Sequence, residues 1–170
     1  MRLSALVFSA AILAAPAAAL AQAWQDYPFP DAGFAVHFPA RPEVTKGAYR
    51  QGDGTSVPAT IYSARAENMI YTITVADFSK TAVKSDAAIA EAEKLAIGDG
   101  KVRAVVDARI NSQYGRELSL KRKDGSVSML AIFFFKNRLY QLDGKAMPPD
   151  ADGGATYAMR FQQSLQFNGD

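Results

Sequence analysis

The sequence has 170 residues, with 19 lysines and arginines against 17 aspartates and glutamates, a single histidine and no cysteine. The absence of cysteine excludes disulfides, thiol catalysis and thiolate metal sites. The nearly balanced charge gives no general attraction for nucleic acid or anionic lipid, so we expect no nucleic-acid partner.

The first 21 residues have the layout of a secretory signal peptide. Arg2 supplies the positive start, residues 3–19 are almost wholly apolar, and an Ala-Leu-Ala segment at 19–21 forms a small-x-small cleavage site. A membrane anchor is the alternative, but Pro16 interrupts a run that would need about 20 apolar residues to span. We predict a signal peptide at 1–21 and one domain at 22–170 that is periplasmic or secreted, with no membrane span after cleavage.

The mature sequence predicts strands connected as hairpins. Phe34, Val36 and Phe38 alternate with Ala35 and His37, which indicates a half-buried strand. Turn residues such as Asp124-Gly125 separate the other predicted strands. These lie at 44–50, 57–65, 69–78, 102–110, 113–122, 126–135 and 138–145.

Two helices are predicted. Ser85 is the expected N-cap of the first, Asp86 suits its positive end, and Gly98 is expected to end it in a left-handed conformation. The second is expected at 154–165. The residues expected on the apolar sides are Ala88, Ile89, Ala92, Leu95 and Ala96 in the first helix and Ala158, Phe161 and Leu165 in the second.

The strand at 126–135 is apolar on both faces. Phe133 and Phe135 point one way, whereas Leu130, Ile132 and Phe134 point the other. Leaving one face in water would cost about 1.5–3 kcal/mol for each large side chain. We therefore predict an α+β fold, a largely antiparallel sheet with helices on both faces (an α/β/α sandwich). An all-β sandwich is the alternative, with the first helix plugging one end.

Three short motifs of the mature sequence resemble those of one known family. The segment Gly33-Phe34-Ala35-Val36-His37-Phe38-Pro39, followed by Pro42, is similar to the opening strand of PsbP-like domains. Residues 138–142 (Arg-Leu-Tyr-Gln-Leu) and 161–165 (Phe-Gln-Gln-Ser-Leu) are similar to a later strand and to the end of the closing helix, with Leu165 in place of an aromatic residue.

The resemblance implies an α/β/α sandwich around an antiparallel sheet. The photosynthetic members bind a membrane complex and help to retain its inorganic cofactors. No matching binding residues occur here, so none is carried over. Many exported bacterial relatives have no assigned function.

Catalytic and metal-binding patterns are weak in this sequence. His37 is the one histidine, and no Gly-x-Ser-x-Gly elbow accompanies it, so we interpret it as an outward-facing strand residue. Asp150-Ala151-Asp152-Gly153 lacks the later ligands of a calcium loop. Asp107 and Glu117 form a carboxylate pair only if the strand register brings them together. We predict no catalytic residue, cofactor or metal.

Two groups of residues are candidates for contact with a partner. Arg116, Lys121, Arg122 and Lys123 are expected as a basic patch around one hairpin tip, although such charges also protect sheet edges from pairing. Trp24 and Tyr27 precede the first predicted strand. They form either an exposed recognition segment or an anchor that holds the amino terminus on the domain.

These observations favour a non-enzymatic exported accessory protein. It would bind another exported or membrane protein through a sheet face, the basic hairpin tip or the aromatic amino-terminal segment. A module that binds a small apolar ligand or a lipid is the alternative, and a dry apolar pocket would favour it. A hydrolase that uses carboxylates or His37 is a third hypothesis. The partner and the oligomeric state are left open.

Overall fold

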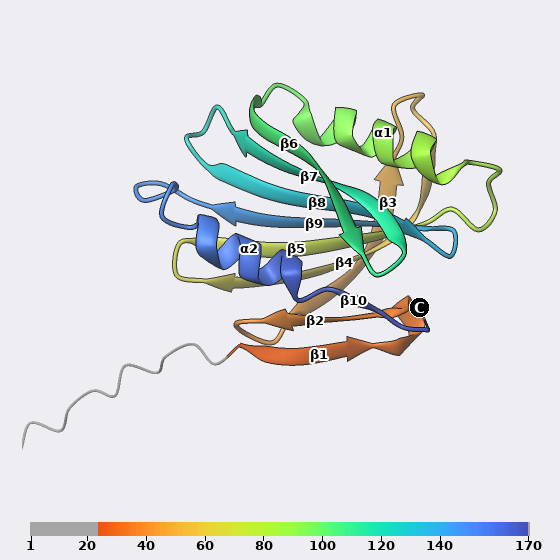
Figure 1. The fold of residues 1–170 in the computed structure, drawn as a ribbon, viewed down its shortest axis with the longest axis horizontal. Coiled ribbons are helices and arrows are strands. Elements are labelled where there is room, and N and C mark those ends of the chain that lie inside the picture. Colours follow the sequence, from red (N-terminus) through yellow and green to blue (C-terminus); the bar gives the residue numbers. More distant parts are fainter. Residues whose placement is uncertain (1–23, 170) are drawn as a thin grey trace, which may run out of the picture.

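A computed structural model describes residues 24–169, and the predicted signal peptide lies outside these residues (Figure 1). The strands are β1 (Gln25–Phe29), β2 (Phe34–Phe38), β3 (Glu43–Arg50), β4 (Ser56–Ala66), β5 (Met69–Asp77), β6 (Lys101–Ile110), β7 (Gln113–Lys121), β8 (Val127–Phe135), β9 (Arg138–Ala146) and β10 (Gln166–Phe167). The helices are α1 (Ser85–Ile97), α2 (Ala155–Gln163) and the short 3-10 turn η1 (Pro30–Ala32).

Seven strands form the main sheet in the order β3-β4-β5-β9-β8-β7-β6. Every neighbouring pair is antiparallel, and hairpins connect β3 to β4, β4 to β5, β6 to β7, β7 to β8 and β8 to β9. The one long-range pairing joins β5 to β9, with Asp77 opposite Arg138 and Met69 opposite Ala146. The chain segment that contains α1 therefore crosses from β5 to the far edge at β6.

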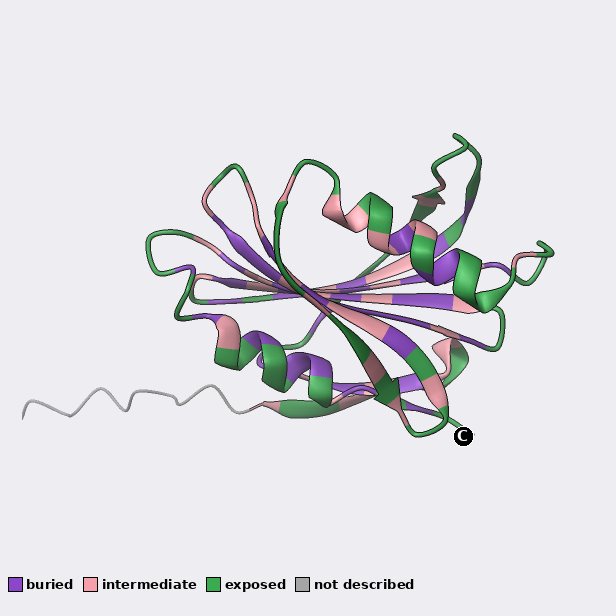
Figure 2. Ribbon diagram, turned by 45° about the horizontal axis from the view of Figure 1, so that its top comes forward, coloured by how far each residue is buried: buried purple, intermediate pink, exposed green. Residues whose placement is uncertain are grey.

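The strand β8 lies inside the sheet and is covered on both faces, as predicted. Leu130 and Ile132 pack in one apolar cluster with α1, whereas Ala131 and Phe133 pack in a second cluster with α2. Figure 2 shows the two helices on opposite sides of the sheet. The predicted α+β fold with helices on both faces is confirmed.

A second sheet of three strands was not predicted. It has the order β1-β2-β10 and packs on the same side of the main sheet as α2 (Figure 1). Phe34 of β2 packs on the main sheet, where its ring centroid lies 5.9 Å from that of Tyr140. Phe38 packs on α2, where its ring centroid lies 5.1 Å from that of Phe161. β1 contains Pro28 and β10 has two residues, so neither shows an alternation long enough to indicate a strand.

The first helix differs from its prediction at both ends. Ser85 is the first helical residue rather than the N-cap, which is Lys84. Gly98 has the expected positive φ of 50°, but its ψ of −119° lies outside the left-handed helical region. The guanidinium of Arg122 instead donates to the terminal carbonyls, at 2.7 Å from Ala96 O. Leu95 lies at the margin of the apolar stripe and is 40% exposed, whereas Ala88, Ile89 and Ala92 are buried as expected.

A glycine lets α2 lie directly on β9. A Cβ atom at Gly144 would lie 2.6 Å from the Cβ of Ala158 and 2.8 Å from its Cα, so the helix would have to move. We expect Gly144→Ala to lower the free energy of unfolding by about 1–3 kcal/mol in urea denaturation. Gly47→Ala is the control, since its Cβ would meet only Ile61 Cδ1 at 3.7 Å. Equal stability of the two variants would contradict this account of the helix contact.

Candidate functional site

A groove runs along the flank of α1 that faces β7. One hollow of about 560 Å³ is lined by Asp86, Ile89, Ala90, Glu93, Tyr114 and Arg116. A second hollow of about 360 Å³ shares Ala90 and Glu93 with the first and continues along α1 to Gly98. The shared residues make the two hollows one open groove.

Arg116 organises the polar wall of this groove. Its Nε donates to Glu93 Oε2 at 3.0 Å, its Nη1 contacts Asp107 Oδ1, and the Tyr114 hydroxyl donates to the same Asp107 oxygen at 2.8 Å. The hydrogen bond from Tyr114 and then that from Arg116 hold the pKa of Asp107 below its usual value. Arg116 thus joins two carboxylates, Glu93 on α1 and Asp107 on β6, and links the helix to this edge of the sheet.

The strand β6 forms one edge of the main sheet beside this groove. All but three of its ten residues are exposed, including Val102 at 41% and Val106 at 52%. Tyr114, on the neighbouring strand, is 43% exposed. An edge strand has backbone N–H and C=O groups without a strand partner on one side, so β6 can pair with an added strand.

The predicted basic residues do not form one patch. Arg116 lies within β7 and contacts α1, away from the hairpin tip, because the β7–β8 turn follows Lys121. Arg122 is held by the end of α1, and Lys123 pairs with Asp99 at 2.8 Å. Lys121 lies directly opposite Lys101 of β6. The strand register therefore places another cation, Lys101, beside the hairpin.

The aromatic amino-terminal residues contact the body of the domain. The Trp24 ring lies edge-on to Tyr71, with centroids 5.2 Å apart, and the guanidinium of Arg160 lies 4.8 Å from the Trp24 centroid. The Tyr27 ring lies 6.1 Å from that of Phe38. These contacts favour the anchoring interpretation of the segment.

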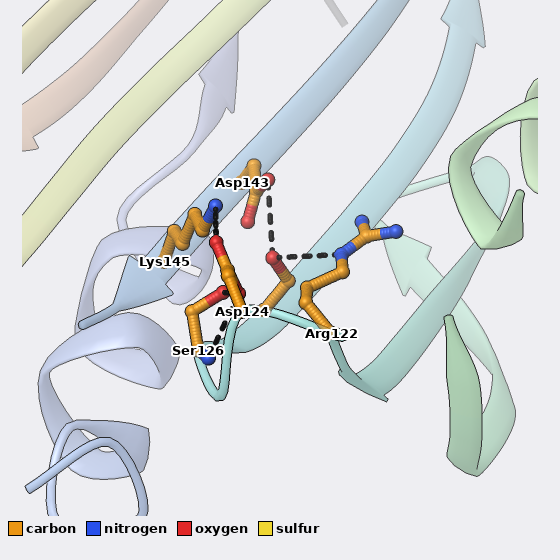
Figure 3. A network of polar contacts seen from close by, with 6 residues as sticks. Arg122, Asp124, Ser126, Asp143 and Lys145 are labelled. Atoms are coloured by element: carbon orange, nitrogen blue, oxygen red, sulfur yellow. Dashed lines mark hydrogen bonds and ion pairs between the residues drawn. The ribbon is translucent and has the colours of Figure 1, made fainter. Parts of the chain in front are cut away.

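A buried carboxyl group that we did not predict lies on β9 (Figure 3). Asp143 Oδ2 accepts a hydrogen bond from Ser128 Oγ at 3.3 Å, whereas its Oδ1 is buried and has no partner among the described residues. Burial raises the pKa of Asp143 to about 6, although Ser128, Arg122 and Lys145 favour the ionised form. A single acidic residue inside a strand was the available signal for this group.

The neighbouring Asp124 has the opposite environment. Its Oδ1 accepts hydrogen bonds from the Ser126 backbone N–H at 2.9 Å and from the Ser126 hydroxyl, and its Oδ2 accepts one from Lys145 at 3.0 Å. These partners, Ser126 first and then Lys145, hold the pKa of Asp124 well below its usual value. The pKa values of the two aspartates in Figure 3 are therefore shifted in opposite directions, upward for Asp143 and downward for Asp124.

The other candidate groups do not converge on one site. His37 lies on the small sheet, with its Nε2 4.0 Å from Asp26 Oδ1. Asp107 lies opposite Arg116 and Glu117 lies opposite Val106, so the two carboxylates are on opposite faces and the carboxylate pair is not formed. Within residues 24–169, no group of three or more histidines and acids has the arrangement of a metal site.

A separate hollow of about 300 Å³ lies between η1 and strands β3, β4 and β5. Its lining includes four charged residues, Asp31, Lys46, Asp77 and Arg138. Arg138 Nη1 donates to the Asp31 carbonyl at 2.9 Å. A lining with four charges does not favour an apolar ligand or a lipid tail.

Comparison with known proteins gives a fold and no sequence family. No family model matches the chain, and no curated protein matches it. Solved structures do match, and they give the chain a PsbP-like fold. The solution structure of cyanobacterial PsbP from Synechocystis sp. PCC 6803 has a TM-score of 0.57 and 10% identity, over 91% of this chain and 98% of that chain.

A protein of unknown function from Pseudomonas aeruginosa also matches, with a TM-score of 0.40 and 12% identity, over 81% of this chain and 94% of that chain. This score is too low to support an argument. None of the helices in residues 24–169 is long and apolar enough to cross a membrane.

Proposed function

We propose that this protein is a non-enzymatic accessory domain, exported from the cytoplasm, that binds another exported or membrane protein. The binding surface in this proposal is the β6 edge together with the adjoining groove on α1. The amino-terminal signal pattern supports export. The open groove between α1 and β7, next to this edge, supports a binding surface there.

The observation that carries the proposal is the exposure of apolar side chains along β6. Val102 and Val106 are 41% and 52% exposed on an edge strand, and they belong to opposite faces of the sheet because their cross-strand neighbours are Leu120 and Glu117. A strand added beside β6 would cover part of both side chains and pair the free backbone groups. The groove beside α1 gives room for the partner's side chains.

The test places a photoreactive amino acid at one position at a time in the full chain, which is expressed in its native host. We expect the groups at Val102 and Val106 to capture the same partner protein. Val44 is the matched control, because it is a valine on the opposite edge strand, β3, and is 49% exposed. Capture of that partner equally at Val44, or at none of the three positions, would overturn the proposed surface.

A further inference from the structure

The charges along β6 indicate the chemistry of the strand that would pair with it. Four residues of β6 are charged: Lys101, Arg103, Asp107 and Arg109. Arg103 pairs with Asp152 at 2.5 Å, and Asp107 is held by Arg116 and Tyr114. Lys101 and Arg109 have no ion pair among the described residues. The free charges of this edge are therefore both positive, one near each end of the strand.

The excess positive charge is strongest at the Lys101 end. Lys101 lies directly opposite Lys121, and cross-strand like charges repel. Two carboxylates of this region already have cationic partners: Asp152 contacts Arg103, and Asp99 contacts Lys123. An additional carboxylate beside Lys101 would relieve this repulsion, so this end of the edge favours an acidic side chain.

We propose that the β6 edge binds an extended segment of a partner protein that is apolar in its middle and has carboxylates near both ends. The apolar residues would lie beside Val102 and Val106, and the carboxylates beside Lys101 and Arg109. This inference rests on the proposed function and deepens it, since it assigns the partner's chemistry at the same surface. Lys101 and Arg109 are about 26 Å apart along an extended strand, so the segment needs about nine residues.

The test is a titration of the isotope-labelled protein with two synthetic peptides. Changes in the NMR chemical shifts of the backbone amides report the binding. Both peptides have about nine residues, with valines at successive central positions so that both faces of the extended peptide are apolar. One ends in aspartates and the other in lysines. We expect the aspartate-ended peptide to shift the amides of β6 and to bind more weakly as salt is added. We expect the lysine-ended peptide to bind about tenfold more weakly or not at all.

Charge reversal gives the matched control. The Lys101→Glu, Arg109→Glu variant is expected to reverse the peptide preference, whereas Lys46→Glu, Arg50→Glu on the opposite edge strand β3 leaves it unchanged. All four side chains are exposed, so folding should survive, and the amide spectrum checks it. Equal binding of both peptides, or shifts centred on β3, would overturn the inference.

Two outcomes separate this inference from the proposed function. If photocapture at Val102 and Val106 succeeds but the peptides show no charge preference, the acidic chemistry is wrong and the binding surface stands. If sedimentation shows a dimer that the Lys101→Glu, Arg109→Glu variant abolishes, β6 binds a second copy of this chain, and the inference is overturned.

Discussion

Replacing Asp143 with asparagine is expected to raise the free energy of unfolding at pH 7.5 by about 2–3 kcal/mol. Burial raises the pKa of Asp143 to about 6, and one of its oxygens has no partner among the described residues. A carboxyl whose pKa is higher in the folded chain binds its proton more tightly there. Ionisation therefore destabilises the fold, and asparagine removes that penalty because it has no charge.

The pH range of this effect follows from the direction of the shift. Below the ordinary carboxyl pKa of 3.8, Asp143 is protonated in both the folded and the unfolded chain, so the variant and the parent should be equally stable. The difference should grow between about pH 4 and pH 6 and then stay constant. Urea denaturation of both proteins from pH 4 to pH 8 measures it. A variant that is less stable than its parent at pH 7.5 would contradict the buried, unpaired environment of Asp143.

Asp124→Asn is the matched control for this experiment. Asp124 is exposed, and Ser126 and Lys145 hold its pKa well below the usual value, so its ionised form stabilises the fold. Asparagine should therefore lower the free energy of unfolding at neutral pH, and the difference should disappear as pH falls through the folded pKa of Asp124. The same substitution at two neighbouring aspartates is thus expected to have opposite signs.

Phe161→Ala is expected to cost about 3–5 kcal/mol, since it removes an aromatic side chain at the junction of three layers. Phe161 is fully buried in α2, and its ring lies 5.1 Å from Phe38 of the small sheet and 5.3 Å from Tyr71 of the main sheet. A cavity here loosens the helix and the small sheet together. Urea or thermal denaturation of the mature chain measures the loss.

Tyr157→Ala supplies the comparison on the same helix. Tyr157 is 50% exposed, so truncating it should change the free energy of unfolding by no more than about 0.5 kcal/mol. Similar losses of stability in the Phe161 and Tyr157 variants would contradict the structure, in which α2 buries Phe161 and exposes Tyr157.

The sequence predicted the layers because they depend on side-chain periodicity. Leu130 and Ile132 alternate with Ala131 and Phe133, and this pattern required cover on both faces of β8. Phe161 follows Ala158 by three residues, which indicated the buried side of α2. Such local patterns do not depend on how distant strands are paired.

The binding surface could not be predicted in the same way, because it depends on strand order and register. Arg116 was grouped with Lys121 as part of one patch, but pairing places it next to Glu93 and Asp107. Lys101 was not a candidate because nothing in the local sequence placed it opposite Lys121. The edge position of β6 follows from the long-range pairing of β5 with β9.

Amide hydrogen exchange of the mature protein, alone and in complex with the partner captured through Val106, tests the central claim most directly. The account predicts that slowed exchange on binding is concentrated in β6, because the added strand takes up backbone N–H groups that now face water. The strand at the opposite edge, β3, should exchange at the same rate in both states. Protection of β3 or of β1, with β6 unchanged, would contradict the account.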